Sequence, residues 1–530
     1  MIGNIYIACA VIAVVCFHAT ISSILPENYP VCPTAACREI ADDILRNINE
    51  NMDPCTDFYD FACGNWPKHN PIPPGEDFYQ QFMVASNRKD ARIKAILEGK
   101  PDLNENPAVE KARKVFAACL DTEATDKTGF KILASILVQN GGWPAATEEW
   151  DSSSWTWQAA DNYYNSFIGL FPLYQIAVQP DSRINGTVLI TLQLPDVKFK
   201  PIYSILVNRN LFFKEITAYK HYIEKLIVTV ANATGSQVSQ EQVASDAHAI
   251  VDFESKFFKL VSETYESPLY YEMMNISYLQ EYYDVADPKN ESGKINWLSS
   301  IQALFKEISR TIDGSQMIIM DASTFLLGLA ELLDKSSPRT LVNYIHFKFV
   351  DHMAKHTTEK VREYIADLNN VLVATESQKL RWKQCLHQNE MSHVVSYEYI
   401  KRYFPEHSKA AALKMIDDIK TQLELQIQSA SWMTQEIKLA AIEKLKNVKE
   451  YIGYPDWYSN ETAVYNYYNE PQVPPGQPED RPRKTNDDRP RGMLSFTSAT
   501  LSGPYGFTNL IGDSKQSQER GPRPDTWHLI

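Results

Sequence analysis

Two histidines, His352 and His356, have the spacing that a metal site on a helix needs. They stand four residues apart in FVDHMAKHTTEK, so both imidazoles would share one face of a helix and could reach one zinc ion. Asp351 or Glu359 could add a third ligand. A helical zinc peptidase also needs a Glu beside the first His to deprotonate the metal-bound water, and Met353 occupies that position. The alternative interpretation is an ordinary, partly exposed helix face.

No other pattern in the chain completes a zinc-peptidase site. None of the eleven histidines is followed by Glu, so the HExxH motif is absent. The inverted motif HxxEH is also absent, because Tyr403 stands where it would need a histidine before Glu406 and His407. No G-x-S-x-G motif, phosphate-binding loop or CxxC pair is present. We therefore predict no catalytic residue and no metal or cofactor in this chain.

The first residues resemble a secretory signal peptide. Residues 5–17 are an unbroken run of apolar or small residues, and small residues suited to cleavage follow at 19–23. We predict a signal peptide at 1–23 and a secreted or extracellular protein. The alternative is an uncleaved anchor that reaches Leu25, which would leave an extracellular ectodomain attached to the membrane.

The composition is that of a large folded protein. The chain has 530 residues, a net charge of −14 and 44% hydrophobic residues. This length indicates more than one domain, or one large domain with appendages. The acidic balance argues against nucleic acid as a partner, because the phosphate backbone attracts basic surfaces.

Cysteines and sequons fit a chain that matures outside the cytosol. Two of the eight cysteines lie in the leader, and the six that remain allow fifteen pairings, among which sequence alone does not choose. These six are Cys32, Cys37, Cys55, Cys63, Cys119 and Cys385. N-glycosylation sequons, which mark surface sites in a secreted chain, occur at Asn185, Asn232, Asn275, Asn290 and Asn460.

The stretch DPCTDFYDFACGNW predicts a short helix with a cysteine near each end. Asp53 can act as the N-cap, Pro54 suits the first helical position, and Gly64 stands just past the end. Eight helical residues rise about 12 Å, whereas a disulfide needs Cα atoms within about 7 Å of each other. We therefore expect that Cys55 and Cys63 do not bond each other.

Apolar periodicity predicts a mainly α protein. Two stripes are clearest, and shorter ones recur at 39–48, 107–120 and 359–373. The first stripe, which Ser408 could cap, is Ala412, Ile416, Ile419, Leu423 and Ile427. The second, with Thr434 before it and Gly453 and Pro455 ending it, is Ile437, Ala441, Leu445 and Val448.

Strand-like runs are few, and the end of the chain looks unstructured. The clearest strand is GTVLITLQL at 186–194, with its dense β-branched residues. Residues 471–491 hold many prolines and charges, and no apolar periodicity follows them. Such a segment buries too little apolar surface to offset the entropy of ordering. We predict a low-complexity, disordered tail at 470–530.

Three stretches resemble the N-terminal part of the neprilysin and endothelin-converting-enzyme family of zinc metallopeptidases. They are CREIADDILRNINENMDPCTDFYDFACGNWPKHNPIP (37–73), RWKQC (381–385) and SWMTQEIKLAAIEKLKNVKEYIGYPD (431–456). The first matches the family pattern D-P-C-x-D-F-Y-x-[YF]-A-C-G-x-W, followed by N-x-I-P. The resemblance covers about 32–468, with a looser middle.

The resemblance implies a large helical N-terminal lobe of a two-lobed ectodomain at 32–468. In the family a catalytic lobe follows, with a substrate strand, HExxH and a downstream ExxxD. None of these follows Pro455 here, so we expect a truncated member whose zinc lobe is missing. The segment VYNYY at 464–468 lies too close to Pro455 to be the family's substrate strand, and we interpret it as a coincidence.

The resemblance also implies a pairing of the cysteines. The family joins the counterparts of Cys32 and Cys37, and those of Cys119 and Cys385. The counterparts of Cys55 and Cys63 bond cysteines of the catalytic lobe, so here these two thiols would be unpaired and could link two chains as a disulfide-bonded dimer. Re-pairing, for example of Cys37 with Cys55, is the alternative.

One substrate contact of the family is replaced in this chain. In neprilysin an Arg eight residues after the Asn of N-x-I-P binds the terminal carboxylate of the peptide. Counted from Asn70, that position is Phe78, and Met83 stands where the Arg has an acidic partner. The resemblance therefore does not imply carboxylate-directed specificity here.

Two hypotheses of function follow. In the first, the chain belongs to a secreted neprilysin-like zinc metalloendopeptidase but is inactive as written, because HExxH and ExxxD are absent. Zinc would then serve only the full-length relatives. In the second, the chain is a genuine non-catalytic secreted protein that binds peptides or a partner protein. Reading the transcript beyond the codon for Tyr468 would distinguish the two.

Overall fold

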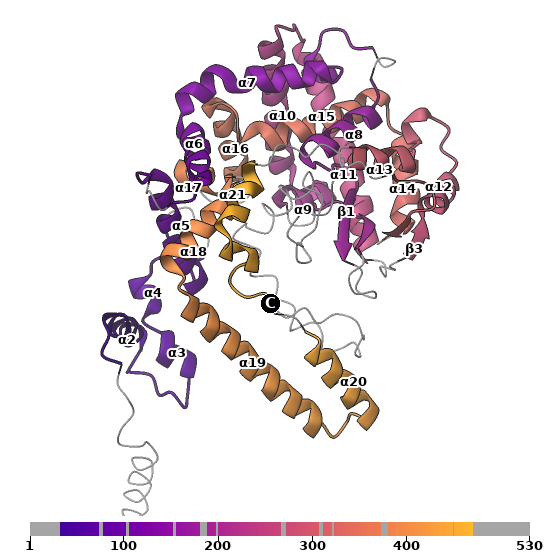
Figure 1. The fold of residues 1–530 in the computed structure, drawn as a ribbon. Coiled ribbons are helices and arrows are strands. Elements are labelled where there is room, and N and C mark those ends of the chain that lie inside the picture. The colour runs from indigo at the N-terminus through magenta and orange to yellow at the C-terminus, as the bar shows by residue number, and fades with distance from the viewer. Residues whose placement is uncertain are drawn as a thin grey trace, which may run out of the picture. The chain divides into compact units, whose positions relative to one another are not determined.

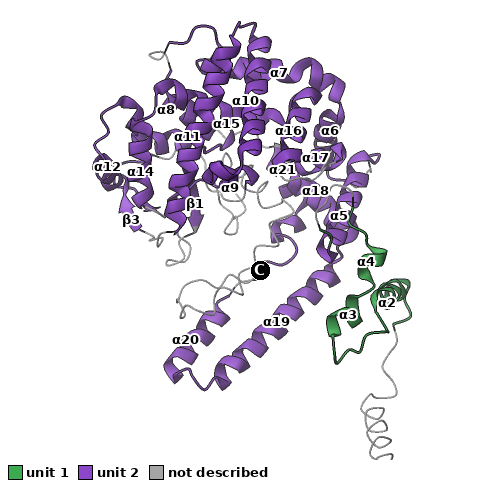
Figure 2. Cartoon of the chain, turned by 180° about the vertical axis from the view of Figure 1, so that it is seen from behind, with its two compact units in different colours: residues 1–79 green, residues 80–530 purple. Residues whose placement is uncertain are grey.

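Helices make up nearly all of the regular structure. The computed structural model describes residues 32–73, 78–101, 105–151, 155–180, 188–197, 200–266, 272–306, 311–320, 323–372, 380–389, 391–448 and 450–469. The predicted signal peptide and the predicted disordered tail lie outside the described residues. The described part divides into two units, which end and begin at Tyr79 and Gln80 (Figure 2).

In its described residues, the smaller unit contains three short helices and almost no core. Its helices are α2 (Ala35–Asn47), α3 (Phe58–Cys63) and α4 (Trp66–His69). The Thr34 side chain caps α2 by accepting from the backbone N–H of Cys37 at 3.2 Å. No described apolar side chain of this unit is buried, and Tyr59 is 79% exposed. Packing within the unit alone therefore contributes little to its stability.

The helix predicted from Pro54 begins later than predicted. Asp57, rather than Asp53, is the N-cap of α3, and its carboxylate accepts from the backbone N–H of Asp60 at 2.9 Å. Asp53 instead caps a turn, where it accepts from the backbone N–H of Cys55 at 3.0 Å. Aspartate suits both positions, since its side chain can cap a turn as well as a helix, and in this chain Asp57 is the residue that starts the helix.

The larger unit is a helical body that also carries a small sheet (Figure 1). The long helices α10 and α11 pack on each other, and α11 also packs on α14 and α15. The helices of this unit are α5 (Gln81–Glu98), α6 (Ala108–Leu120), α7 (Thr122–Gln139), α8 (Trp157–Ile168), α9 (Pro201–Val207), α10 (Phe213–Thr234), α11 (Gln240–Glu266), α12 (Ile276–Asp284), α13 (Trp297–Phe305), α14 (Ser323–Asp334), α15 (Pro338–Ala354), α16 (Glu359–Leu372), α17 (Arg381–His387), α18 (Ser392–Tyr403), α19 (Glu406–Ser429), α20 (Gln435–Lys446) and α21 (Glu461–Asn469).

The sheet has four strands in the order β1-β2-β4-β3. The strands are β1 (Gln175–Pro180), β2 (Val188–Gln193), β3 (Glu272–Asn275) and β4 (Met317–Met320). The outer pairs are antiparallel and the central pair, β2 with β4, is parallel. The strand predicted from GTVLITLQL is confirmed as β2, which is buried along most of its length, as its β-branched composition favours.

The predicted helices at 39–48, 107–120 and 359–373 are confirmed as α2, α6 and α16. The two long stripes are also helical, as α19 and α20, but their predicted ends were partly wrong. Pro405 is the N-cap of α19, and Ser408 lies inside the helix. Thr434 does cap α20, by accepting from the backbone N–H of Ile437. This helix ends at Lys446, so Val448 and Gly453 lie beyond it.

Two apolar clusters form the core of the larger unit. The larger cluster runs from Phe130 to Leu368 along the chain and includes the buried face of the sheet. The smaller cluster joins Ile96 and its neighbours on α5 and α6 to residues between Cys385 and Val464. The second cluster therefore depends on contacts between segments almost three hundred residues apart.

Polar groups are buried inside the larger cluster. Asp161 on α8 is 1% exposed and accepts hydrogen bonds from the Asn165 amide at 2.9 Å and the Tyr174 hydroxyl at 3.2 Å. Burial raises the pKa of Asp161 to about 7, although both hydrogen bonds act in the opposite direction. Burial also lowers the pKa of His346, which shares a 2.8 Å hydrogen bond with Tyr164, to about 3. Asp161 is therefore neutral below about pH 7, and His346 is neutral above about pH 3.

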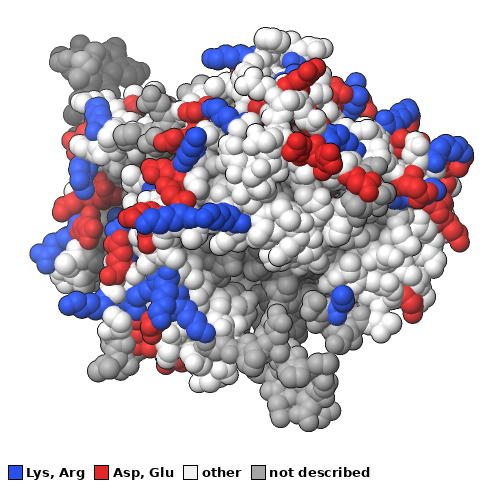
Figure 3. Space-filling model, turned by 90° about the horizontal axis from the view of Figure 1, so that it is seen from above, with Lys and Arg blue, Asp and Glu red and all other residues white. Residues whose placement is uncertain are grey.

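Acidic and basic side chains are interspersed on the face seen in Figure 3. Many form local pairs one helical turn apart, such as Lys294 with Glu291 and Lys335 with Glu331. Such exposed pairs contribute little to stability. The absence of a nucleic-acid partner stays a prediction. Within the described ranges, no helix is both long enough and apolar enough to cross a bilayer.

The buried carboxyl predicts a pH-dependent stability. Between about pH 4 and pH 7 the folded chain keeps the Asp161 proton and the unfolded chain loses it, so stability falls as pH rises through this window. Replacing Asp161 with Asn removes this dependence. From pH 4 to pH 8 the wild type should lose up to about 4 kcal/mol of unfolding free energy relative to Asp161→Asn, as measured by urea denaturation at each pH.

The matched control is Asp252→Asn. Asp252 is partly exposed and forms ion pairs with Arg209 and Lys256. Relative to this variant, the wild type should lose no stability between pH 4 and pH 8. A pH dependence that Asp161→Asn leaves unchanged would contradict the assignment.

Candidate functional site

The helix predicted to carry both His352 and His356 ends between them. His352 lies in the last turn of α15, which ends at Ala354, and His356 lies in the turn that follows. Glu359 begins a different helix, α16. The prediction that these residues share one helix face was therefore wrong. The reason is local, since the turn at 355–358 breaks the spacing that a continuous helix would have given.

Electrostatics around the two histidines also disfavour a divalent cation. Burial and the charge of Lys355 lower the pKa of His352 and of His356 to about 4. The imidazoles are neutral at pH 7, as ligands must be, but the ammonium group of Lys355 would repel a metal ion. Across the described ranges, no three His, Cys, Asp or Glu side chains gather in a way that could hold a metal. The absence of zinc remains a prediction.

Asp351, the other proposed ligand, belongs to a buried polar network. It accepts from the hydroxyl of Tyr222 at 2.8 Å. Nearby, Lys348 forms a buried ion pair with Glu254 at 2.8 Å, and the Tyr219 hydroxyl donates to the same carboxylate at 2.7 Å. The network links α10, α11 and α15, and its satisfied bonds indicate a structural role.

This ion pair was not predicted from the sequence. The available signal was a charged residue next to aromatic side chains, Lys348 between two phenylalanines in YIHFKFVD and Glu254 directly after Phe253 in VDFESKFF. A buried charge is seldom stable without a partner, so two such residues on different helices could have been proposed as a pair.

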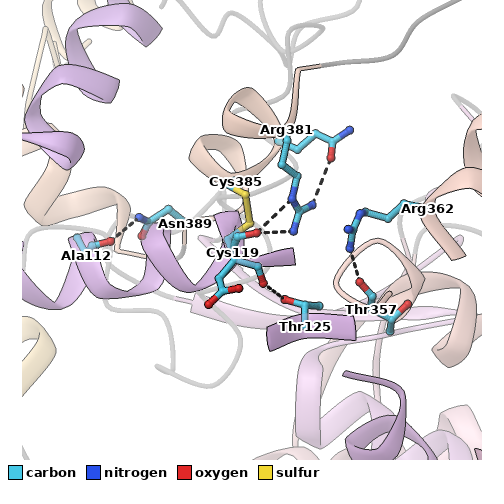
Figure 4. Close-up of a disulfide and its surroundings, with 10 residues drawn as sticks. Ala112, Cys119, Thr125, Thr357, Arg362, Arg381, Cys385 and Asn389 are labelled. Carbon is cyan, nitrogen blue, oxygen red and sulfur yellow. Dashed lines mark hydrogen bonds between the residues drawn. A yellow bond between two sulfur atoms is a disulfide. The ribbon is translucent and has the colours of Figure 1, made fainter. Parts of the chain in front are cut away.

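The disulfide between Cys119 and Cys385 joins α6 to α17, with Cys385 almost fully buried. Hydrogen bonds reinforce the connection (Figure 4). Arg381 donates twice to the carbonyl oxygen of Cys119, at 3.2 and 2.7 Å, and the Asn389 amide donates to the carbonyl oxygen of Ala112 at 3.1 Å. The disulfide and these hydrogen bonds therefore connect α6 to α17 in one small region.

The remaining cysteines behave as the resemblance implies. Cys32 and Cys37 form the second disulfide, across a separation of five residues. Cys55 and Cys63 are free thiols, and Cys55 is exposed while Cys63 is half-buried. The continuous helix that was expected to separate the two thiols is absent, because Cys55 lies in the turn before α3. The alternative pairing of Cys37 with Cys55 is not seen.

The two positions that replace the family's carboxylate contact lie in different units. Phe78 belongs to the smaller unit and is 45% exposed, and Met83 lies in α5 of the larger unit and is half-buried. Neither side chain carries a charge that could bind a carboxylate. The expectation of altered specificity stays a prediction.

Four of the five sequon asparagines fall within the described residues. Asn232, Asn290 and Asn460 are exposed, and Asn275 is half-buried as the N-cap of α12. The amide of Asn290 donates to the backbone carbonyl of Asp334 at 2.9 Å. Asn185 lies outside the described residues. Surface exposure is compatible with glycosylation, which remains a prediction.

A helical hairpin made of α19 and α20 (residues 406–446) extends from the helical body (Figures 1 and 2). No residue of α19 is buried, and Leu445 alone is buried among the residues of α20. Large apolar side chains are strongly exposed along it, including Met415 at 64%, Leu439 at 59% and Trp432 at 75%. An exposed apolar surface of this kind is typical of an interface.

The segment VYNYY at 464–468 is helical, as part of α21. Its rings join an aromatic cluster. The hydroxyl of Tyr468 accepts a hydrogen bond from the backbone N–H of His393 at 2.9 Å, and the hydroxyl of Tyr458 shares a 2.9 Å hydrogen bond with Nδ1 of the same histidine. The segment therefore forms no substrate strand here, and His393 is held by structural contacts.

Comparison with known proteins decides the family. A family model described as peptidase family M13 matches residues 54–455, which is most of the chain. The chain belongs to peptidase family M13. The match begins at the Pro of the DPC motif and ends at the Pro of IGYPD, the same stretches that carry the resemblance in the sequence.

Relatives in family M13 include neprilysins. Neprilysin-1 of Trittame loki is 24% identical over 448 residues, which cover 83% of this chain and 60% of the relative. Human neprilysin is 25% identical over 448 residues, covering 83% of this chain and 59% of its own length. The chain thus spans about three fifths of the length of these M13 relatives.

Solved M13 structures share the fold. The zinc metalloprotease Zmp1 of Mycobacterium tuberculosis, in complex with an inhibitor, superposes with a TM-score of 0.60 at 18% identity, over 80% of this chain and 62% of that protein. PepO from Lactobacillus rhamnosis gives a TM-score of 0.58 at 16% identity, over 78% of this chain and 64% of that protein. The prediction of a mainly α, neprilysin-like N-terminal lobe is confirmed.

Removing the long-range disulfide should destabilise the larger unit. The bond closes a loop across a separation of 266 residues, for which chain entropy allows at most about 5 kcal/mol. The Cys119→Ser, Cys385→Ser double variant should lose less than this, because a real denatured chain is not an ideal random coil and keeps residual structure. The free energy of unfolding from denaturant titration measures the loss.

The control is the Cys32→Ser, Cys37→Ser double variant, whose short loop limits the effect to about 2 kcal/mol. A long-loop variant as stable as the wild type would show that the polar contacts alone determine the stability of this connection.

Proposed function

We propose that this chain supplies the non-catalytic lobe of a neprilysin-like zinc metalloendopeptidase, and that it hydrolyses no peptide by itself. Membership of family M13 and the shared fold support the lobe assignment. The sequence contains no HExxH motif and therefore lacks the paired histidines and the general base that such hydrolysis needs. Zinc would be supplied by a catalytic lobe, on a continuation of this chain or on another polypeptide.

The observation that carries the proposal is the exposed apolar surface of the α19–α20 hairpin. Helices of soluble proteins usually bury their apolar stripe, whereas Ile419 and Leu439 remain at least half exposed here. About two fifths of the length of these relatives lies outside the part that this chain matches. A second lobe of that size could cover such a surface and enclose a peptide between the two lobes.

We also propose that the protein is secreted, with glycans on exposed sequons. The apolar leader of residues 5–17 supports export, and the two disulfides fit an oxidising compartment. A membrane-anchored form with an extracellular ectodomain is the alternative. Release of the chain into culture medium, and its mobility after removal of N-glycans, would distinguish the two.

A second candidate function is that of a non-catalytic secreted protein that binds peptides or a partner. The same exposed hairpin favours it, because it could dock a protein other than a catalytic lobe. Reading the transcript past the codon for Tyr468 separates the candidates. Continuation into HExxH and ExxxD would support the enzyme, and a stop codon after the printed tail would support the binding protein.

The 530-residue chain should contain no stoichiometric zinc and cleave no peptide. The physical reason is that the described part of the chain gathers no third ligand around His352 and His356. Elemental analysis of the purified chain and a fluorogenic peptide assay, each with added zinc, measure these properties. One tightly held zinc per chain that is lost in His352→Ala or His356→Ala would overturn the proposal.

The free thiols should link chains covalently. Cys55 is exposed, so Cys55→Ser should remove most disulfide-bonded dimer from non-reducing gels, whereas Cys63→Ser should remove less. The double variant should run as a monomer. A monomeric wild type with a mapped Cys55–Cys63 bond would contradict this prediction and favour the binding protein, whose disulfide set would then be closed.

A further inference from the structure

A stripe of polar side chains runs along α15 where the helix faces the core. Arg339, Asn343 and His346 follow one another at intervals of four and three residues, so they share one side of the helix. Asn343 and His346 have no exposed surface. Polar groups at this depth need hydrogen-bond partners inside the protein, because the bulk solvent cannot supply them.

The side-chain amide of Asn343 has only one possible orientation. Its Oδ1 accepts from the backbone N–H of Ala145 at 2.8 Å, a bond that an NH₂ group in the same place could not accept. The Nδ2 group therefore points elsewhere. Within the described ranges, no acceptor lies within hydrogen-bonding reach of Nδ2. The amide N–H bonds of Asn343 are thus buried without a protein partner.

The tautomer of His346 follows from its contact with Tyr164. Nδ1 of His346 lies 2.8 Å from the Tyr164 hydroxyl, and the two rings meet edge to face. Burial raises the pKa of Tyr164 and lowers the pKa of His346 to about 3, so the phenol keeps its proton and the imidazole carries one. Donation from Nδ1 to the hydroxyl would leave both the hydroxyl proton and Nε2 unsatisfied, whereas donation from the hydroxyl leaves only Nε2. The imidazole proton is therefore on Nε2.

The neighbouring turn adds another donor rather than an acceptor. α15 packs on α8 and on a short 3₁₀ helix at Pro144–Ala146. Nε1 of Trp143, directly before this turn, is also buried without an acceptor among the described residues. The groups left over near this turn are therefore neutral N–H donors, and each would cost free energy if it stayed unsatisfied.

The charge at this place disfavours an anion as the missing acceptor. Arg339, the cation of the stripe, already donates to both carboxylate oxygens of Asp246, at 3.0 and 2.8 Å, and to the backbone carbonyl of Pro144 at 2.9 Å. A buried anion without a free cation beside it would carry a large desolvation penalty. A neutral acceptor is therefore the favoured occupant.

We propose that one internal water molecule is bound between Asn343 and His346, where it accepts from Nδ2 of the first and from Nε2 of the second. A buried water makes two to four hydrogen bonds, and side chains three positions apart on a helix are close enough for one water to bridge them. The water would join the part of α15 that contacts α8 to the part that contacts the turn at 143–146. This binding site lies in the core and does not depend on the proposed peptidase role.

Oxygen-17 relaxation dispersion tests the site in solution, because it counts water molecules that stay bound for longer than the protein takes to tumble. The Tyr164→Phe, His346→Phe double variant should contain one long-lived water fewer than the wild type, since it loses Nε2 and leaves no unpaired hydroxyl. The matched control, Tyr164→Phe alone, keeps Nε2 and should contain the same number as the wild type. Equal numbers in the wild type and the double variant, or the same loss in the control, would overturn the proposal.

Crystallography of the wild-type chain gives a second test that does not depend on how well the variants fold. We expect electron density for one water oxygen at about 2.7–3.2 Å from both Nδ2 of Asn343 and Nε2 of His346. A crystal soaked in sodium bromide distinguishes a halide from water, because bromide scatters anomalously and water does not. An anomalous peak between the two nitrogens would overturn the proposal in favour of an anion, and side chains packed so closely that no water fits would overturn it altogether.

Discussion

The larger unit depends on the joining of α6 to α17. Every residue of the larger apolar cluster lies between Cys119 and Cys385 in the sequence, so the disulfide closes the loop that contains this core. The smaller cluster is built from the segments on the two outer sides of that loop. The bond, and the hydrogen bonds from Arg381 and Asn389, therefore add to the apolar contacts that pack α5 and α6 against α18 and α21.

Buried polar groups then fix how the helices inside the loop pack. The Lys348–Glu254 pair and the Tyr219 hydroxyl allow one arrangement of α10, α11 and α15, because any other would leave a charge without a partner. Apolar contacts alone would tolerate small rotations of these helices. Asp161 and His346 act differently, since Asp161 is neutral below about pH 7 and His346 is neutral above about pH 3. Each depends on a few hydrogen bonds, from Asn165 and Tyr174 to Asp161 and from Tyr164 to His346.

Local patterns in the sequence were enough for β2 and for the helices α2, α6, α16, α19 and α20, because apolar spacing and β-branching act over a few residues. They failed where two local signals compete. Asp53 and Asp57 both suit an N-cap, and the downstream one starts α3. The spacing of His352 and His356 assumed a continuous helix, whereas α15 ends at Ala354. The cysteine pairing came from resemblance to a family, since spacing leaves fifteen arrangements open.

The exposure of the α19–α20 hairpin has a consequence for motion. Regions with little buried apolar surface open with a smaller free energy than the core does. With no buried residue in α19, the outer turns of the hairpin should open without disturbing either apolar cluster. Backbone amides around 425–440 would then exchange with solvent much faster than those of α11. Anything that docks on the hairpin would slow this exchange, so the hairpin itself would report when its apolar surface is covered.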